Sequence, residues 1–273
     1  MDFFKRGLNG FEIKILALIF MTFDHLSSFL WGAINLPTWF NWIGRISAPL
    51  FIFMVVQGFF HTRSKKKYML RLYGWSILMA LGNSLINNLL PHPNGSVIFN
   101  NIFATMFIIT VYLLGIEYIS SGYSEKSAKK LSLGIAIMIV PVILSGALMS
   151  LLDSGNTLIM NIMMYLVPTP LFVEGGIIFI ALGIGLYLCI NSKKALAIFY
   201  IVLCSIVFFM MAGAGFTYEN LFLINYQWLM IFALPFMLLY NGEKGRSLKY
   251  FFYLYYPIHC YILYALGIVF LKQ

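Results

Sequence analysis

The chain has 273 residues, of which 61% are hydrophobic and only 10% are charged, and its mean hydropathy is +0.88. A soluble globular domain carries about 25% charged residues, so this composition excludes a water-soluble fold and predicts a polytopic membrane protein. The net charge of +9 is compatible with nucleic-acid binding, but the placement of the basic residues argues against nucleic acid as a partner.

Nine apolar segments have about the 20 residues that an α-helix needs to span a bilayer. The expected spans are residues 11–31, 42–60, 68–90, 97–119, 130–151, 171–190, 195–213, 222–240 and 250–270. The segment 156–168 is too short to cross comfortably and is expected to be re-entrant or interfacial, although ten crossings remain possible. We therefore expect an all-α transmembrane helical bundle of nine or ten spans, in a single domain over residues 1–273.

Basic residues cluster at one end of alternate spans. They are Lys5, Arg6 and Lys14; Arg63, Lys65, Lys66, Lys67 and Arg71; Lys126, Lys129 and Lys130; Lys193 and Lys194; Lys244, Arg246 and Lys249. A cytoplasmic N-terminus with nine crossings places all of them inside, which is a strong positive-inside bias. The same charges are expected to contact anionic membrane lipids.

The first expected span contains an ionisable pair, Asp24 and His25, within "MTFDHLSSFL". Charged side chains inside a bilayer usually face the bundle interior and mark function. Adjacent residues point about 100° apart on a helix, so the pair cannot face one partner squarely. Asp24 pairs either with His25 or with Arg45 at the start of the second span. His25, with an unperturbed pKa of about 6.5, is either a structural interhelical residue or a general base.

Two basic features accompany this pair. Lys14 precedes His25 by eleven residues, or three helical turns, so both point the same way about 16.5 Å apart and could line one tunnel. The run "HTRSKKKYMLRL" at 61–72 either contacts lipid head groups or binds the phosphates of a soluble anionic cofactor. The sequence contains neither a Walker A motif nor G-x-G-x-x-G, so an ordinary nucleotide-binding fold is not expected.

Other polar residues in apolar segments are second-rank candidates. Glu174, His259 and Asn83 are candidates for substrate binding or a proton path, although asparagine more often joins neighbouring helices. Pro257 is expected to kink the last span beside His259. The three cysteines, Cys189, Cys204 and Cys260, have neither metal-ligand nor disulfide spacing, so no metal is expected.

Four stretches together resemble the TraX family. They are "KILALIFMTFDHLSSFL" (14–30), "IGRISAPLFIFMVVQGFFHTRSKKKYMLRL" (43–72), "VEGGIIFIALGIGLYL" (173–188) and "QWLMIFALPFMLLYNGEKGRSLKYFFYLYYPIH" (227–259). The D-H pair, the "GR" that opens the second span, the "GFFHTR" exit, the "LLYNG" turn and the final "YPIH" are jointly specific.

The resemblance implies an activity. The family takes its name from an F-pilin acetylase, which is similar to a larger group of multi-pass acyltransferases. Those proteins have a basic residue eleven positions before a histidine in the first span, and a basic pair or cluster after a later one. Lys14 and His25 match the first feature, with Lys where Arg is usual, whereas Lys67 and Arg71 match the second only loosely. The resemblance implies acetyl-CoA as donor, but the acceptor does not carry over.

The resulting hypothesis is an O- or N-acetyltransferase of the bacterial cytoplasmic membrane. His25 would be the base, oriented by Asp24, with Arg45 steadying the oxyanion. Acetyl-CoA would bind through Lys14, Arg63, Lys66, Lys67 and Arg71. The acceptor would be a peptide, glycan or lipid. The alternative is a proton-coupled transporter or flippase, for which the usual inverted repeat with paired broken helices is not evident.

Overall fold

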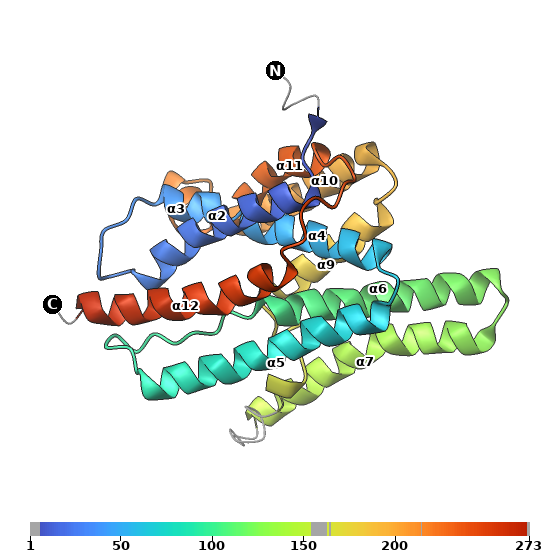
Figure 1. Cartoon of the computed structure of the whole chain (residues 1–273), viewed down its shortest axis with the longest axis horizontal. Coiled ribbons are helices and arrows are strands. Elements are labelled where there is room, and N and C mark those ends of the chain that lie inside the picture. Colours follow the sequence, from blue (N-terminus) through green and yellow to red (C-terminus); the bar gives the residue numbers. More distant parts are fainter. Residues whose placement is uncertain (1–5, 154–162, 164, 214, 272–273) are drawn as a thin grey trace. The chain divides into compact units, whose positions relative to one another are not determined.

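A computed structural model describes residues 6–153, 163, 165–213 and 215–271 (Figure 1). Its elements are α2 (Gly10–Phe29), α3 (Trp39–Gly44), α4 (Ser47–His61), α5 (Lys65–Leu89), α6 (Ile102–Ser124), α7 (Ala128–Asp153), α9 (Gly176–Leu188), α10 (Lys193–Ala212), the π-helix η1 (Glu219–Ile224), the 3₁₀ helix η2 (Tyr226–Ala233), α11 (Leu234–Leu238) and α12 (Lys249–Leu271). The only β pairing among these described residues is an isolated bridge between Leu8 and Tyr240. The all-α class is therefore confirmed.

Each of the nine expected spans coincides with one helix or with consecutive short helices. Within the described part of the chain, five segments are both long and apolar enough to cross a membrane: Trp39–His61, Ile102–Ser124, Ala128–Leu151, Lys193–Ala212 and Tyr250–Leu271. Two more, Gly176–Leu188 and Tyr226–Leu238, are apolar but shorter. The number of crossings and the cytoplasmic N-terminus stay predictions, and most of the segment 156–168 lies outside the described residues.

The chain divides into two compact units. Unit 1 comprises Met1–Met54, Leu85–Ile98 and Leu188–Gln273, and unit 2 comprises Val55–Ser84 and Phe99–Tyr187. The expectation of a single membrane domain stays a prediction.

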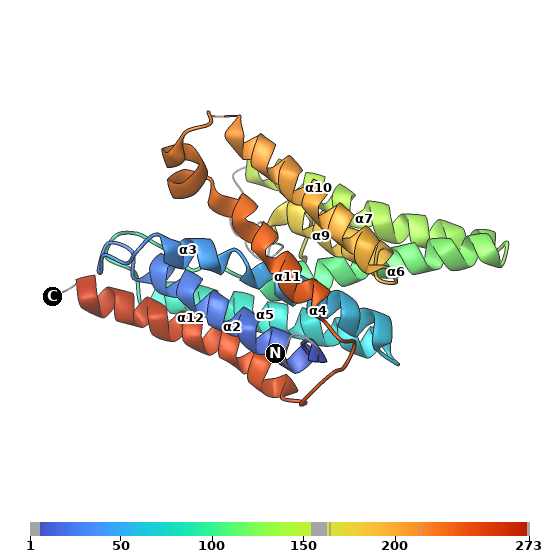
Figure 2. The ribbon, with the colours of Figure 1, turned by 90° about the horizontal axis from the view of Figure 1, so that it is seen from above.

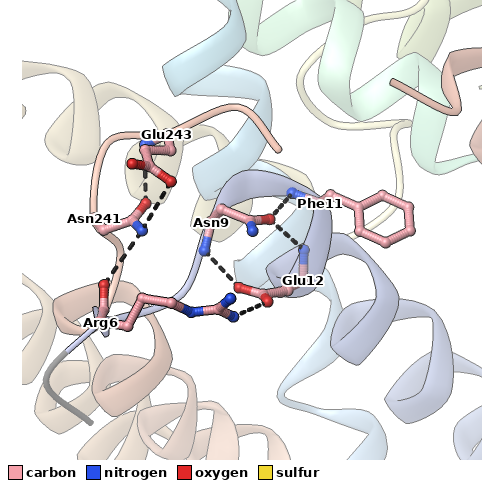
Figure 3. Close-up of polar contacts among 6 residues, drawn as sticks. All are labelled: Arg6, Asn9, Phe11, Glu12, Asn241 and Glu243. Carbon is pink, nitrogen blue, oxygen red and sulfur yellow. Dashed lines mark hydrogen bonds and ion pairs between the residues drawn. The ribbon is translucent and has the colours of Figure 1, made fainter. Parts of the chain in front are cut away.

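In unit 1, α2 begins at Gly10 because Asn9 and Glu12 form a capping box (Figure 3). The Asn9 side chain accepts the backbone N–H groups of Phe11 and Glu12, each at 3.0 Å, and the Glu12 carboxylate accepts the Asn9 N–H at 2.9 Å. These bonds satisfy N–H groups that have no partner inside the helix.

The segment that follows α11 is bonded to the start of α2. Leu8 N–H donates to the Leu239 carbonyl at 2.8 Å, and Asn241 N–H donates to the Leu8 carbonyl at 3.0 Å. The Asn241 side chain also donates to the Arg6 carbonyl at 3.3 Å (Figure 3). Residues more than 230 positions apart are thus joined by backbone hydrogen bonds, which fix where α2 starts within the unit.

Helices α2 and α12 lie side by side and run in the same direction (Figure 2). Phe11 packs edge-on against Phe252, with ring centroids 6.0 Å apart, and Phe29 packs against Tyr264 at 6.3 Å. A side chain at Gly267 would collide with the Phe29 carbonyl, so this glycine permits close approach of the two helices. The face of α2 directed at α12 therefore runs from its first turn to its last.

In unit 2, α6 and α7 form an antiparallel pair that packs through glycines. A Cβ atom built on Gly134 of α7 would lie 2.7 Å from the backbone nitrogen of Ile119 and 2.9 Å from the Gly115 carbonyl oxygen. Small residues let helix backbones approach closely inside membranes, where packing rather than hydrophobic burial drives association.

We expect Gly134→Ala to destabilise the protein by about 1–3 kcal/mol, because the new methyl group meets backbone that cannot move aside easily. Gly146→Ala, in the same helix, is the matched control: a Cβ there has nothing within 4 Å among the described atoms. That control should be neutral or slightly stabilising, since alanine favours helix more than glycine does. Thermal unfolding of both variants in detergent micelles measures the difference, and equal midpoints would contradict this packing.

Candidate functional site

Two histidines from opposite ends of the chain meet inside unit 1. The His25 Nδ1 atom of α2 lies 2.7 Å from the His259 Nε2 atom of α12. The ring planes differ by 7° and the ring centroids are 4.9 Å apart, which is the N–N distance plus one ring radius at each end. The two imidazoles therefore lie edge to edge in one plane, joined by a hydrogen bond. His25 is 3% exposed and His259 8% exposed.

The direction of this hydrogen bond follows from a backbone carbonyl. The His259 Nδ1 atom lies 2.7 Å from the carbonyl oxygen of Tyr255, which can only accept, so His259 carries its proton on Nδ1. Its Nε2 is then an acceptor when the ring is neutral, and His25 must donate from Nδ1. A neutral His25 consequently has an unprotonated Nε2, and no residue in the described part of the chain is hydrogen-bonded to that atom.

A second polar contact one turn away holds the same two helices together. The Thr22 hydroxyl donates to the Leu18 carbonyl at 2.8 Å, so it accepts from the Tyr255 hydroxyl at 2.7 Å. Tyr255 also lies against the His259 ring, with centroids 4.8 Å apart. Hydrogen-bonding groups that bridge helices inside a membrane contribute about 0.6 kcal/mol each on average, so these contacts specify alignment more than they add stability.

Cys260 completes the cluster. Its Sγ atom lies 3.4 Å from His25 Nδ1 and 3.8 Å from His259 Nε2, and the residue is fully buried. Three potential metal-ligand atoms thus converge from two helices. The cysteine spacing predicts no metal site, because His25 lies 235 positions from Cys260 and that separation carries no information about their contact.

Asp24 pairs with Arg45, which settles the alternatives left open by the sequence. Arg45 lies in the turn between α3 and α4, and its other nitrogens donate to Gln227 Oε1 at 3.2 Å and to the Asn41 carbonyl at 3.3 Å. Asp24 was expected to orient His25; the structure gives that contact to His259 instead. Since adjacent residues point about 100° apart, the two α2 side chains face different neighbours.

Different elements cover the Asp24 face and the His25 face of α2. A side chain at Gly44 would collide with Asp24, so the end of α3 lies directly on α2 at that level. Lys14 points about 80° away from Asp24 around the helix axis, and its Nζ atom lies 5.5 Å from the Phe252 ring centroid of α12. Lys14 and His25 therefore face the same helix, as their spacing predicted, and that face is covered by α12.

The predicted cofactor-binding cations lie in unit 2. Arg63, Lys66 and Lys67 are exposed and Arg71 is partly exposed at the junction of α4 and α5. None of these four side chains has a hydrogen bond or ion pair with another described residue. Lys65, by contrast, pairs with Glu117 of α6, and Tyr187 donates to the same carboxylate at 2.8 Å. The carboxylate of Glu117 thus has a structural role that its position in an apolar segment did not reveal.

Glu174 and Asn83 belong to a polar network at the start of α6. The Glu174 carboxylate accepts the backbone N–H of Asn101 at 3.0 Å, and Asn101 caps α6. Asn83 donates to the Asn100 carbonyl at 2.9 Å, whereas its own carbonyl oxygen is buried with no hydrogen bond from the described residues. A carboxylate at a helix N-terminus is favoured by the helix dipole, so this environment supplies a structural reason for Glu174.

The chain was compared with protein families, with curated proteins and with solved structures. A family profile described as TraX protein matches residues 10–267. The chain is also similar to the probable fimbrial assembly protein FimC, serogroup H1, of Dichelobacter nodosus, with 35% identity over 75 residues. That match covers 26% of this chain and 29% of the relative. No solved structure matches.

The Asp24–Arg45 pair should show strong energetic coupling. We expect Asp24→Ala and Arg45→Ala each to destabilise the protein by about 1–3 kcal/mol, because each leaves a partly buried charge without its partner. The double variant should lose less than the sum, by about 1 kcal/mol.

The control is the exposed pair of Lys130 and Glu125, whose coupling should be near zero because solvent screens it. Unfolding in mixed micelles gives the free energies for both cycles. Additive effects at Asp24 and Arg45 would show that this contact is not maintained in the protein.

Proposed function

The chain belongs to the TraX family, and on that premise we propose that it is a membrane-bound acetyltransferase. The donor is acetyl-CoA from the cytoplasm, and the acceptor is a hydroxyl or amine at the membrane or beyond its outer face. The partial similarity to a protein named for fimbrial assembly favours a peptide acceptor over a glycan or lipid. The membrane is the bacterial cytoplasmic membrane, with the N-terminus inside.

The observation that carries the proposal is the chain of contacts from the Tyr255 carbonyl through His259 to His25 Nδ1, from which we infer an unprotonated Nε2 on His25. A general base needs a nitrogen lone pair and a fixed ring orientation. The chain of hydrogen bonds from the Tyr255 carbonyl through His259 to His25 Nδ1 supplies both. His259 has the orienting role that an aspartate has in many catalytic triads, and it also shares the charge when His25 becomes an imidazolium.

The proposed reaction is a direct transfer of the acetyl group from CoA to the acceptor. His25 Nε2 takes the proton of the acceptor hydroxyl or amine as that group attacks the thioester carbonyl carbon. The tetrahedral intermediate collapses, the carbon–sulfur bond breaks, and the departing CoA thiolate takes the proton from His25 Nε2. The products are the acetylated acceptor and CoA, and His25 returns to its starting tautomer. No covalent enzyme intermediate is required.

Binding of the donor is assigned to the four cations at the start of α5. Arg63, Lys66 and Lys67 lie at a helix N-terminus, where positive side chains are unfavourable unless an anion is present. Backbone N–H groups and these side chains can together bind the phosphates of CoA. Arg71 lies about two turns into the helix and adds a fourth charge. Lys14, in unit 1, is kept as a further candidate for binding the donor.

We assign Arg45 and Asp24 a role in positioning the helices around His25, in preference to a direct role in catalysis. All three nitrogens of the Arg45 guanidinium are bonded to other groups, so an oxyanion role requires it to release one of them. Access to His25 requires movement as well, because the ring is 3% exposed and is in contact with Phe29 and Tyr256. Glu174 and Asn83 remain second-rank candidates for the acceptor or the proton path.

His25→Ala should lower acetyl transfer from acetyl-CoA by about 10²–10⁴-fold, the usual contribution of a general base. His92→Ala is the control, since His92 is a buried histidine in the same unit that takes no part in this chain of hydrogen bonds. The assay uses purified protein in liposomes and radiolabelled acetyl-CoA, with unfolding temperature as the test of integrity. Full activity of a folded His25→Ala protein would end this mechanism.

CoA should raise the unfolding temperature of the wild-type protein, because a ligand that binds only the folded state stabilises it by about 2.7 kcal/mol at 100 times its Kd. The triple variant Arg63→Gln, Lys66→Gln, Lys67→Gln should lose most of this shift.

A control variant with the same loss of charge is Lys126→Gln, Lys129→Gln, Lys194→Gln, in which three other exposed lysines are neutralised. It should keep the shift. Absence of any CoA effect in the wild-type protein, together with substrate-coupled proton flux, would favour the transporter alternative.

A further inference from the structure

We propose that His25, His259 and Cys260 form a binding site for Zn²⁺, in which the metal ion replaces the proton shared by the two imidazoles. The site is formed by residues of unit 1 alone. It departs from the expectation, based on cysteine spacing, that the chain has no metal site. The metal here is a competitor of the proton and not a required cofactor.

The distances between the three donor atoms are near those of a zinc site. Tetrahedral zinc, with ligands at about 2.0–2.1 Å for nitrogen and 2.3 Å for sulfur, separates two nitrogens by about 3.4 Å and nitrogen from sulfur by about 3.5 Å. The two nitrogen–sulfur distances here are 3.4 and 3.8 Å. The nitrogen–nitrogen distance of 2.7 Å is that of the proton-bridged form, in which the two rings are collinear. Tetrahedral metal binding therefore needs the two rings to separate and to tilt, so that their lone pairs meet at an angle.

The surroundings of the ligands also fit a metal site. A histidine that binds a metal usually donates its other N–H to a carbonyl or carboxylate, which fixes the ring and its tautomer. His259 has this contact with the Tyr255 carbonyl. The Thr22–Tyr255 hydrogen bond ties that part of α12 to α2, so the ligands from the two helices are held in register. Three protein ligands leave a fourth position of a tetrahedral ion open.

The charges favour a cation once the thiol ionises. A buried thiolate without a counter-ion is costly, and Cys260 is fully buried. Binding of Zn²⁺ releases the Cys260 thiol proton to solvent and forms the zinc–sulfur bond, while the Nδ1 proton of His25 moves to Nε2. Both imidazoles stay neutral, as ligation requires. Nitrogen and thiolate donors together select zinc over magnesium or calcium, which prefer oxygen.

Zinc binding has a consequence for catalysis that rests on the proposed function. With the metal on Nδ1, His25 carries its proton on Nε2 and has no lone pair for the acceptor. The zinc-bound protein is therefore inactive in acetyl transfer, and the proton-bridged protein is the active form. The site would make the enzyme sensitive to free zinc at the level set by its affinity.

The test uses full-length protein purified in detergent through an affinity tag without histidines. Zn²⁺ binding is measured by titration calorimetry, and Co²⁺ is the spectroscopic probe because its visible and near-ultraviolet absorption reports tetrahedral geometry and thiolate ligation. Cys260→Ser tests the site. The matched control is Cys204→Ser, which replaces another buried cysteine of unit 1 that lies outside the cluster.

We expect one Zn²⁺ per chain, a thiolate-to-cobalt charge-transfer band in the wild-type and Cys204→Ser proteins, and loss of that band in Cys260→Ser with at least about tenfold weaker Zn²⁺ binding. An unchanged cobalt spectrum in Cys260→Ser, or no stoichiometric binding by the wild-type protein, would overturn the site.

Acetyl transfer is measured in parallel with and without Zn²⁺. Inhibition that Cys260→Ser relieves supports the competition with the proton, and undiminished transfer by zinc-saturated wild-type protein would overturn it. The two proposals fail separately. A cobalt spectrum without any acetyl transfer refutes the proposed function alone, whereas acetyl transfer without metal binding refutes the zinc site alone.

Discussion

The hydrogen bond from His259 to the Tyr255 carbonyl determines the chemistry available at the centre of unit 1. A carbonyl oxygen can only accept, so it fixes the proton of His259 on Nδ1, and this in turn fixes the proton of His25. One backbone atom within the last helix thereby decides which nitrogen of a residue in the first helix is unprotonated. Both the proposed base and the proposed zinc site depend on this arrangement.

Buried charge imposes the second constraint. Asp24 and Arg45 neutralise each other beside the histidine pair, and Lys65 and Glu117 do the same in unit 2. Ionisable groups in apolar surroundings are tolerated when they are paired and hydrogen-bonded. The pairs thus account for most of the charges that stand out in the apolar segments. The four cations around the start of α5, whose side chains have no ion pair or hydrogen bond with another described residue, are the ones assigned to a phosphorylated donor.

Two uses of the same cluster follow from one feature, the short His25–His259 contact. In the proposed function, a proton between the rings lets the cluster orient a base; in the proposed zinc site, a metal ion between them blocks that base. This cluster differs from a simple pair of hydrogen-bonded histidines because the Cys260 Sγ atom lies beside both rings. A thiol adds nothing to orientation of the base but adds a soft ligand to a metal site.

The sequence by itself determined the all-α class, the positions of the helices and the presence of an ionisable pair, Asp24 and His25, within the first apolar helix, because hydrophobic runs of about 20 residues and isolated charges within them are local signals. The same-face relation of Lys14 and His25 also followed from helical geometry alone. Only the tertiary structure decided the partners: Arg45 for Asp24, and His259 with Cys260 for His25. Those contacts join the two ends of the chain, and no sequence spacing of 235 residues carries information about the packing of α2 against α12.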